Sequence, residues 1–153
     1  MKKLIKILLL LILTLPLYGQ AHKIDSTINA VLVAHKIPHY TRKLIIAQAK
    51  FESGNYTNKL AKRHNNLFGM MHPRKRLTRS MGPLARAEGR PGYAVYASIE
   101  DSVEDMLFYL WDKKQTPRYK SSEEYVRFLK KNRFFAASEE HYLKGLRYYL
   151  KEL

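Results

Sequence analysis

The chain has 153 residues and is strongly basic, with 28 Lys and Arg against 13 Asp and Glu, and it contains no cysteine. This length fits one domain with a real hydrophobic core and argues against two independent domains. Without cysteine, disulfides and thiolate metal sites are excluded. The six histidines are scattered without metal-ligand spacing, so we expect neither a metal nor another cofactor.

The N-terminus has the three-part layout of a secretory signal peptide. Three lysines precede an apolar run at 7–13, and a short segment then ends at Gly19. The apolar run is too short for a comfortable membrane span, so we expect 1–19 to be cleaved, with an uncleaved anchor as the alternative. The mature protein would be secreted or periplasmic, without a transmembrane anchor.

The mature chain would keep 25 basic and 13 acidic residues, a formal net charge of +12. A surface this basic attracts polyanions over long distances. For an exported protein the nearest polyanions are acidic wall peptides, teichoic acids and lipid head groups. We therefore expect anionic envelope polymers rather than nucleic acid as partners, and the sequence leaves the oligomeric state open.

The mature chain is predicted to be mainly helical. Apolar periodicity, capping residues and helix breakers indicate helices over about 25–36, 41–52, 58–64, 98–114, 122–131 and 138–150. Asp25 or Ser26 would cap the first helix. Thr41 would cap the second, and Gly54 would end it in a left-handed conformation.

From Met70 to Gly92 the helical period disappears, and glycine, proline and basic residues accumulate. This pattern predicts a loop-rich lobe, with one arm of a hairpin near 93–96. The expected class is mainly α (α+β), with a helical body and a small irregular or β-hairpin lobe. A lobe inserted after the second helix would form a cleft with the body.

Glu52 lies on the packed face of the second predicted helix, in line with Leu44 and Ala49, whereas Lys43 and Lys50 take the opposite side. Burying a carboxylate is costly unless it is paired, hydrogen-bonded or protonated. Desolvation and the negative end of the helix dipole both raise its pKa, as expected for a general acid working near neutral pH. The alternative is a cap or salt bridge at the edge of the core.

Another acidic cluster needs no catalytic explanation. It comprises Glu100, Asp101, Glu104 and Asp105, in the first turns of the predicted helix at 98–114. The helix dipole favours negative charge there, so we expect capping.

Several segments occur together at a characteristic spacing: Gln48-Ala-Lys-Phe-Glu-Ser-Gly54, Leu60-Ala61, Asn65-Asn-Leu-Phe-Gly-Met70 and Gly92-Tyr-Ala-Val-Tyr96. In this combination the chain resembles the bacterial glucosaminidase family, glycoside hydrolase family 73, which includes flagellar peptidoglycan hydrolases and autolysins. The similarity runs from about Arg42 to Leu150, and either half of the pattern alone would be weak.

The resemblance implies a lysozyme-like domain over 20–153, with a saccharide cleft between a helical lobe and a small β-lobe. It also implies cleavage of the β-1,4 bond after N-acetylglucosamine in peptidoglycan strands, with Glu52 as the catalytic acid. Cleavage at N-acetylmuramic acid or of chitin-like chains stays open. The alternative from another class is a non-catalytic wall- or nucleic-acid-binding protein that uses the basic segment Arg74–Arg90.

The second catalytic group has two candidates. In the family the second catalytic group comes from the β-lobe, where Glu88 is the acid available between Met70 and Tyr96. Alternatively, Glu88 is a solvated acid that pairs with arginines and has no catalytic role. Without such a partner, the substrate's own acetamido group can attack the anomeric carbon. The segment around Tyr142 resembles the family's C-terminal part, where a tyrosine faces the cleft, although Tyr142 could equally be a core tyrosine.

The residues expected to bind substrate are Gln48, Asn65, Asn66, Phe68, Tyr93 and Tyr96. Amides hydrogen-bond sugar hydroxyl and acetamido groups, and aromatic rings stack on pyranose faces. Alternatively, the two asparagines form a turn and do not bind substrate, and Phe68 is expected to lie mostly in the core. Tyr93 and Tyr96 lie on an extended stretch, and we expect both to point to one side, toward the groove.

Overall fold

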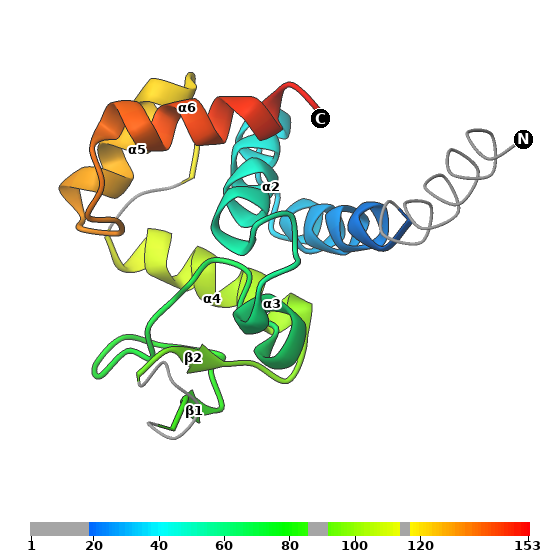
Figure 1. Cartoon of the computed structure of the whole chain (residues 1–153). Helices are drawn as coiled ribbons and strands as arrows, with labels where there is room; N and C mark the ends of the chain where they lie inside the picture. Colours follow the sequence, from blue (N-terminus) through cyan, green and yellow to red (C-terminus); the bar gives the residue numbers. More distant parts are fainter. Residues whose placement is uncertain (1–18, 86–91, 114–116) are drawn as a thin grey trace, which may run out of the picture.

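The computed structural model describes residues 19–85, 92–113 and 117–153, and Figure 1 shows that the chain is mainly helical with a small antiparallel sheet, as predicted. Residues 19–34 are helical and are followed by α2 (His39–Ser53), α3 (Lys59–His64), β1 (Gly82–Pro83), β2 (Ala94–Val95), α4 (Ile99–Asp112), α5 (Ser122–Lys131) and α6 (Glu139–Leu150). Within these ranges no helix is both long and apolar enough to span a membrane. The predictions for 1–18 and for Glu88 fall outside the described residues.

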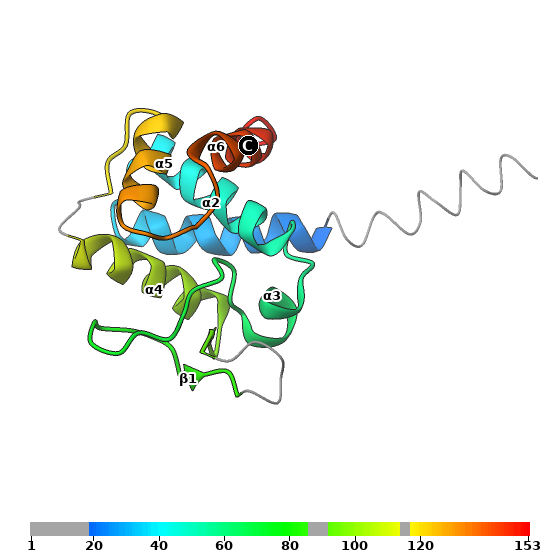
Figure 2. The same ribbon diagram turned by 60° about the vertical axis from the view of Figure 1, so that its left-hand side comes forward.

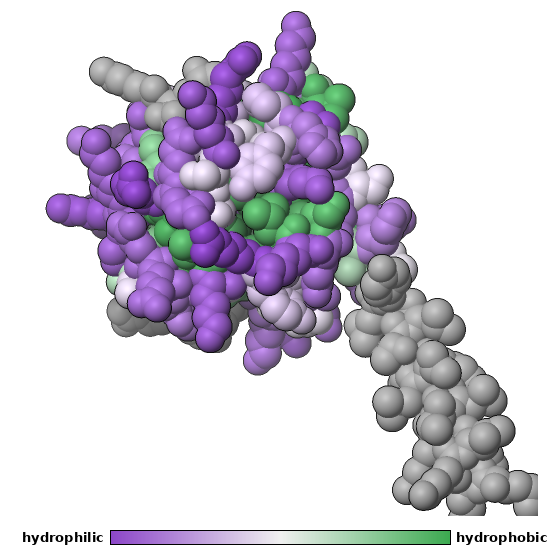
Figure 3. Space-filling model, turned by 90° about the horizontal axis from the view of Figure 1, so that it is seen from above, coloured by the Kyte–Doolittle hydropathy of each residue, from purple (hydrophilic) through white to green (hydrophobic). Residues whose placement is uncertain are grey.

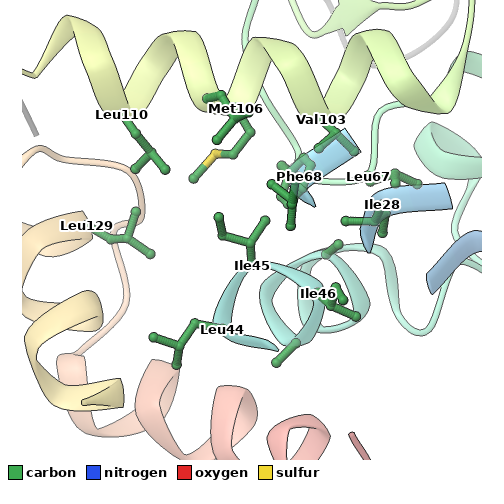
Figure 4. Close-up of a cluster of buried hydrophobic side chains, with 14 of the residues drawn as sticks. Ile28, Leu44, Ile45, Ile46, Leu67, Phe68, Val103, Met106, Leu110 and Leu129 are labelled. Carbon is green, nitrogen blue, oxygen red and sulfur yellow. The ribbon is translucent and has the colours of Figure 1, made fainter. Parts of the chain in front are cut away.

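Helix α2 is the centre of the core. Leu44, Ile45 and Ala49 are completely buried, because α2 has neighbours on several sides. In Figure 4, Met106 of α4 and Leu129 of α5 lie around Ile45. Helices α5 and α6 cover one side of α2, whereas α4 and the lobe with β1 and β2 lie on the other (Figure 2).

The contact between α2 and α6 is close because Gly145 has no side chain. A Cβ atom at this position would overlap the ring of Phe51. The glycine thus lets α6 approach α2 near the C-terminal end of α2. Seen from the side of α5 and α6, the surface is mainly hydrophilic, with small apolar areas between polar side chains (Figure 3).

The first helix differs from its prediction. It is already helical at residue 19, so neither Asp25 nor Ser26 caps it. Instead, Asp25 accepts a hydrogen bond from the Tyr56 hydroxyl (2.5 Å) and pairs with Lys50 (Nζ–Oδ2 2.9 Å). The prediction that Lys50 lies opposite the packed face is wrong, because the helix at 19–34 covers that side and leaves Lys50 only 7% exposed.

The other helix ends compare with the sequence patterns as follows, with a difference at the start of α2. Ser98 caps α4 as predicted, and α2 ends at left-handed Gly54 (φ +59°). The N-cap of α2 is Pro38, which offers no side-chain bond. Thr41 is not the cap; it is buried, and its hydroxyl accepts a hydrogen bond from the backbone N–H of Tyr119 (3.0 Å).

The lobe contains the predicted hairpin in a short form. β1 pairs with β2 in antiparallel register, Gly82 opposite Val95 and Pro83 opposite Ala94. An isolated bridge between Met71 and Tyr93 extends the pairing. Backbone pairing therefore fixes the chain just before and after Tyr93.

Asp105 of α4 anchors this lobe, which corrects the prediction that it only serves the helix N-terminus. It is fully buried, and Arg76 binds both of its carboxylate oxygens (2.9 and 2.8 Å) while the Tyr96 hydroxyl donates a third bond (2.7 Å). Burial alone would raise the pKa of Asp105, but hydrogen bonds from Arg76, Thr78 and Tyr96 and the Arg76 charge hold it below its usual value. The basic lobe thus uses part of its charge internally.

Candidate active site

Two of the three predicted catalytic residues meet in the structure. Glu52 is the penultimate residue of α2 and is partly buried, and Tyr142 lies in the first turn of α6 with 2% of its surface exposed. The Tyr142 hydroxyl donates a hydrogen bond of 2.5 Å to Oε1 of Glu52. The close approach of α6 to α2 brings together two residues that are 90 positions apart in the sequence.

The environment of Glu52 favours its protonated form. Burial raises the pKa of Glu52, and the hydrogen bond from Tyr142 lowers it by a smaller amount, so the net shift is upward. Burial and the nearby Glu52 carboxylate also raise the pKa of Tyr142 well above its ordinary value. Tyr142 therefore keeps its proton and acts as a donor to Glu52.

Aromatic side chains hold the Tyr142 ring in place. Phe135 stacks on it, with ring centroids 3.8 Å apart and planes inclined by 10°, and Phe51 meets it edge-on at 5.1 Å. Lys130 donates hydrogen bonds to the carbonyl groups of residues 136 and 137 and lies over the Phe135 ring. These contacts on both sides restrict the position of the Tyr142 hydroxyl.

The other carboxylate oxygen of Glu52 is near the lobe. A Cβ atom on Gly69 would lie 3.9 Å from Oε2 of Glu52 and 4.0 Å from the Tyr93 ring. Gly69 has φ +62°, a left-handed conformation that glycine adopts readily. Residue 69 thus places no side chain between Glu52 and Tyr93.

Tyr96 does not share this position, which corrects the prediction that Tyr93 and Tyr96 point to one side. On an extended chain, residues three apart point to opposite faces. Tyr96 is 2% exposed and its hydroxyl binds Asp105, whereas Tyr93 is partly exposed and lies near Gly69.

Asn66 has a structural environment. It is 1% exposed; its amide nitrogen donates to the carbonyl groups of Met70 and Ala94, and its oxygen accepts from the backbone N–H of Met70 (2.9 Å each). No group of this amide remains for a sugar. Because Asn66 ties the chain after Phe68 to the hairpin, it helps to place Gly69 beside Glu52.

Asn65 and Phe68 also have structural roles, in a turn and in the core respectively. Asn65 ends α3 in a left-handed conformation (φ +51°) and donates to the carbonyl groups of Tyr96 and Ala97. Phe68 is 1% exposed and belongs to the core, as expected. We therefore leave Asn65, Asn66, Phe68 and Tyr96 out of the substrate site proposed below.

Gln48 is one turn before Glu52 and is completely buried. Its side-chain oxygen accepts a hydrogen bond from the Tyr125 hydroxyl of α5. Its side-chain nitrogen is buried and makes no hydrogen bond with a described residue. Tyr125 was not a candidate from the sequence, because no motif distinguishes it from the other tyrosines.

No other described carboxylate contributes to the pKa shift of Glu52, which comes from burial and Tyr142. Glu88, the predicted second acid, is outside the described residues. The described ranges also contain no group of three or more His, Cys, Asp or Glu side chains that could hold a metal ion. Among the described residues, the site thus brings one carboxyl group into contact with a tyrosine hydroxyl.

A hollow of about 870 Å³ lies elsewhere, and Glu52 does not line it. It is bordered by the first described helix, the end of α2, the residues after α2 and the chain end. Asp25, Lys50 and Tyr56 are among its lining residues. Asp25 binds both Lys50 and the Tyr56 hydroxyl, so the charges of Asp25 and Lys50 are paired within the protein. The hollow is separate from the carboxylic acid chemistry at Glu52.

Two solved structures share the fold. A type VI secretion system effector-immunity complex from Pseudomonas protegens has a TM-score of 0.64 and 15% identity, over 86% of this chain and 89% of that chain. The catalytic domain of the autolysin Auto from Listeria monocytogenes has a TM-score of 0.59 and 20% identity, over 89% of this chain and 83% of that chain. These likenesses confirm the predicted lysozyme-like fold class.

The family is established by sequence. No protein with a curated functional description matches the chain significantly. The glucosaminidase family, described as mannosyl-glycoprotein endo-beta-N-acetylglucosaminidase, matches residues 28–153. This match covers most of the sequence and includes Glu52 and Tyr142. The chain therefore belongs to the glucosaminidase family.

Proposed function

We propose that this protein is a peptidoglycan hydrolase that cleaves the β-1,4 bond after N-acetylglucosamine, with Glu52 as general acid. The observation that carries the proposal is the partly buried Glu52 with a raised pKa, hydrogen-bonded to Tyr142 and next to Gly69, which has no side chain. Family membership supports the glycosidic substrate.

In the proposed reaction, protonated Glu52 gives its proton to the glycosidic oxygen as the bond to the anomeric carbon breaks. Negative charge then develops on the Glu52 carboxylate. The bond from Tyr142 favours this ionised form. Burial thus keeps the proton on Glu52 before the reaction, and Tyr142 eases its release. Tyr93, on the other side of Gly69, is the described aromatic residue best placed to contact the sugar.

The anomeric carbon also needs a nucleophile. One route uses a carboxylate from the lobe, for which Glu88 is the candidate, either as the nucleophile or as the base that activates water. The other route uses the acetamido oxygen of the substrate. A Glu88→Gln variant separates them. The acetamido route predicts activity within about threefold of wild type, whereas a carboxylate nucleophile predicts a loss of roughly 100-fold or more.

The proposed location is the cell envelope or the outside of the cell, where the leader at 1–19 would direct the chain. N-terminal sequencing of the protein exported by a bacterial host checks this directly. A mature N-terminus at Gln20 supports cleavage after Gly19, and an intact N-terminus in the membrane fraction contradicts it.

The function is tested by digesting purified peptidoglycan with wild type and Glu52→Gln and analysing the reducing ends by mass spectrometry. We expect fragments that end in N-acetylglucosamine, and a loss of about 100-fold or more in the variant. Fragments ending in N-acetylmuramic acid would contradict the bond assignment. Full activity of the variant would contradict the role of Glu52.

The alternative of a non-catalytic binder relies on the basic lobe. Two of its cations are already paired within the protein, since Arg76 binds Asp105 and Arg79 binds Glu104 (2.6 Å). A binder driven by charge would lose affinity for anionic polymers steeply with salt and would be unaffected by Glu52→Gln.

A further inference from the structure

We propose that Met71 contacts the substrate: together with Tyr93 it forms an apolar surface beside Glu52, on which the sugar next to the cleaved bond packs. The inference rests on the proposed function, with Glu52 as the general acid of a glycan hydrolase. It adds a residue outside the sequence motifs, and it concerns binding of the glycan strand rather than transfer of the proton.

Backbone pairing places Met71 and Tyr93 side by side. The two residues form an antiparallel bridge, and the backbone hydrogen bonds between their neighbours on either side are both 2.8 Å long. The two opposed residues are thus a pair without a hydrogen bond between them. In such a pair the Cα atoms are about 4.5 Å apart, and both side chains project to the same face. Met71 and Tyr93 therefore present one joint surface.

Residue 69 connects this pair to the acid. A Cβ atom on Gly69 would lie 4.0 Å from the Tyr93 ring and 3.9 Å from Oε2 of Glu52. Met71 follows Gly69 by two residues, so their Cα atoms are at most about 7 Å apart. The carboxylic acid, the aromatic ring and the thioether side chain therefore lie in one small region, although α2 and two segments of the lobe supply them.

The Met71 side chain is exposed, and its end lies against backbone. It is 53% exposed, and a Cβ atom on Gly92 would be only 2.9 Å from Cε of Met71. Gly92 has φ +88°, so a side chain there would be strained as well as crowded. A single exposed apolar side chain is ordinary on a protein surface. On the same face as the Tyr93 ring, however, Met71 enlarges the apolar area beside Glu52.

The chemistry of this surface fits an N-acetylated sugar. The C–H face of a pyranose ring and the acetamido methyl group are apolar, and a flexible, polarizable thioether adapts to irregular apolar shapes. A glycan strand continues past the bond that is cleaved, so its adjoining sugars lie on the surface around Glu52. Met71 has no group that transfers a proton. It should stabilise the bound substrate and the transition state equally, and so affect KM rather than kcat.

Met81 offers a matched control on the same lobe. It is 66% exposed and directly precedes β1. On that side of Tyr93, the backbone partner is Leu84 (N–O 2.6 Å), three positions after Met81. Met81 therefore does not share the cross-strand position beside Tyr93. Its removal measures the general effect of losing an exposed methionine from the lobe.

The contact is tested by NMR on the full chain with ¹³C-labelled methionine methyl groups and the Glu52→Gln change, so that the sugar is not cleaved. Met71→Leu and Met81→Leu assign the two resonances. The soluble probe is a tetramer of β-1,4-linked N-acetylglucosamine. On its addition we expect the Met71 methyl group to shift and to show nuclear Overhauser effects to sugar protons. The Met81 methyl group should do neither.

Hydrolysis of solubilised peptidoglycan gives a second readout. Met71→Ala should raise KM by roughly 5- to 10-fold, the effect expected when a half-exposed apolar side chain is no longer buried by the sugar. Its kcat should stay within about twofold of wild type. Met71→Leu keeps an apolar side chain of similar volume and should restore KM. Met81→Ala should change neither constant, and thermal unfolding of each variant checks that it is folded.

The inference is overturned if the Met71 methyl group does not respond to the sugar at any concentration, or if Met71→Ala has the KM of wild type. A fall in kcat without a rise in KM would also contradict it. Failure of the proposed function would show differently: wild type would not hydrolyse peptidoglycan, or Glu52→Gln would match it, while NMR would still detect sugar bound at Met71.

Discussion

Removing the Tyr142 hydroxyl should slow hydrolysis and change its pH dependence in a defined direction. Tyr142→Phe keeps the ring contacts with Phe135 and Phe51 and removes only the 2.5 Å hydrogen bond to Glu52. A hydrogen bond to a charged group contributes about 1.5–3 kcal/mol. Since about 1.36 kcal/mol corresponds to tenfold in rate, kcat should fall by roughly 10- to 150-fold.

The sign of the pH effect follows from the same bond. Tyr142 lowers the pKa of Glu52 against the larger effect of burial, so its removal lets the pKa rise. More enzyme then carries the catalytic proton at alkaline pH, and the alkaline limb of kcat moves upward even though the maximum is lower. Peptidoglycan turnover across the pH range, with thermal unfolding as a folding control, measures both effects. An unchanged kcat, or a limb that moves to lower pH, would refute this explanation.

Three further predictions concern stability. Because the pKa of Glu52 is raised on folding, the protonated side chain contributes stability at low pH that is lost as the pH rises through the folded-state pKa. Glu52→Gln should therefore raise Tm by a few degrees at neutral pH and by less in acid. A Tm difference that is the same at all pH values would argue against burial as the cause of the pKa shift. Gly145→Ala should destabilise the fold by about 1–3 kcal/mol in urea unfolding, since its Cβ would overlap Phe51; an unchanged midpoint would mean that α6 adjusts freely. Asp105→Ala should cost about 3–5 kcal/mol, because it leaves the Arg76 charge without its partner, and unaltered stability would show that the lobe is anchored elsewhere.

The helices were the most predictable part of the fold. Long apolar periods and nearby capping residues are local signals, and Gly54 and Ser98 end and begin helices as the sequence indicated. The motif at 48–54 also predicted Glu52 as the catalytic acid. Its partner Tyr142 was recognised through the family pattern, because spacing alone does not bring two residues 90 positions apart together.

The missed features depend on contacts between distant segments. The pairs of Lys50 with Asp25 and of Arg76 with Asp105 join segments that are 25 and 29 residues apart, so no helical periodicity shows them. The same holds for Tyr125, whose hydroxyl meets an amide 77 residues away. Local patterns thus located the elements, whereas the tertiary packing decided which polar groups became buried partners.

In the proposed mechanism, Glu52 protonates the departing glycosidic oxygen. The most direct test measures the first turnover of wild type and of Glu52→Gln on two substrates. One is peptidoglycan, and the other is a soluble dinitrophenyl glycoside of an N-acetylglucosamine-terminated glycan. The dinitrophenolate leaving group of the second substrate needs no proton. A general acid matters for the sugar leaving group but little for the phenolate. The predicted result is a loss of about 100-fold or more on peptidoglycan and less than about tenfold on the aryl glycoside. Equal losses on both substrates, or no loss on peptidoglycan, would contradict it.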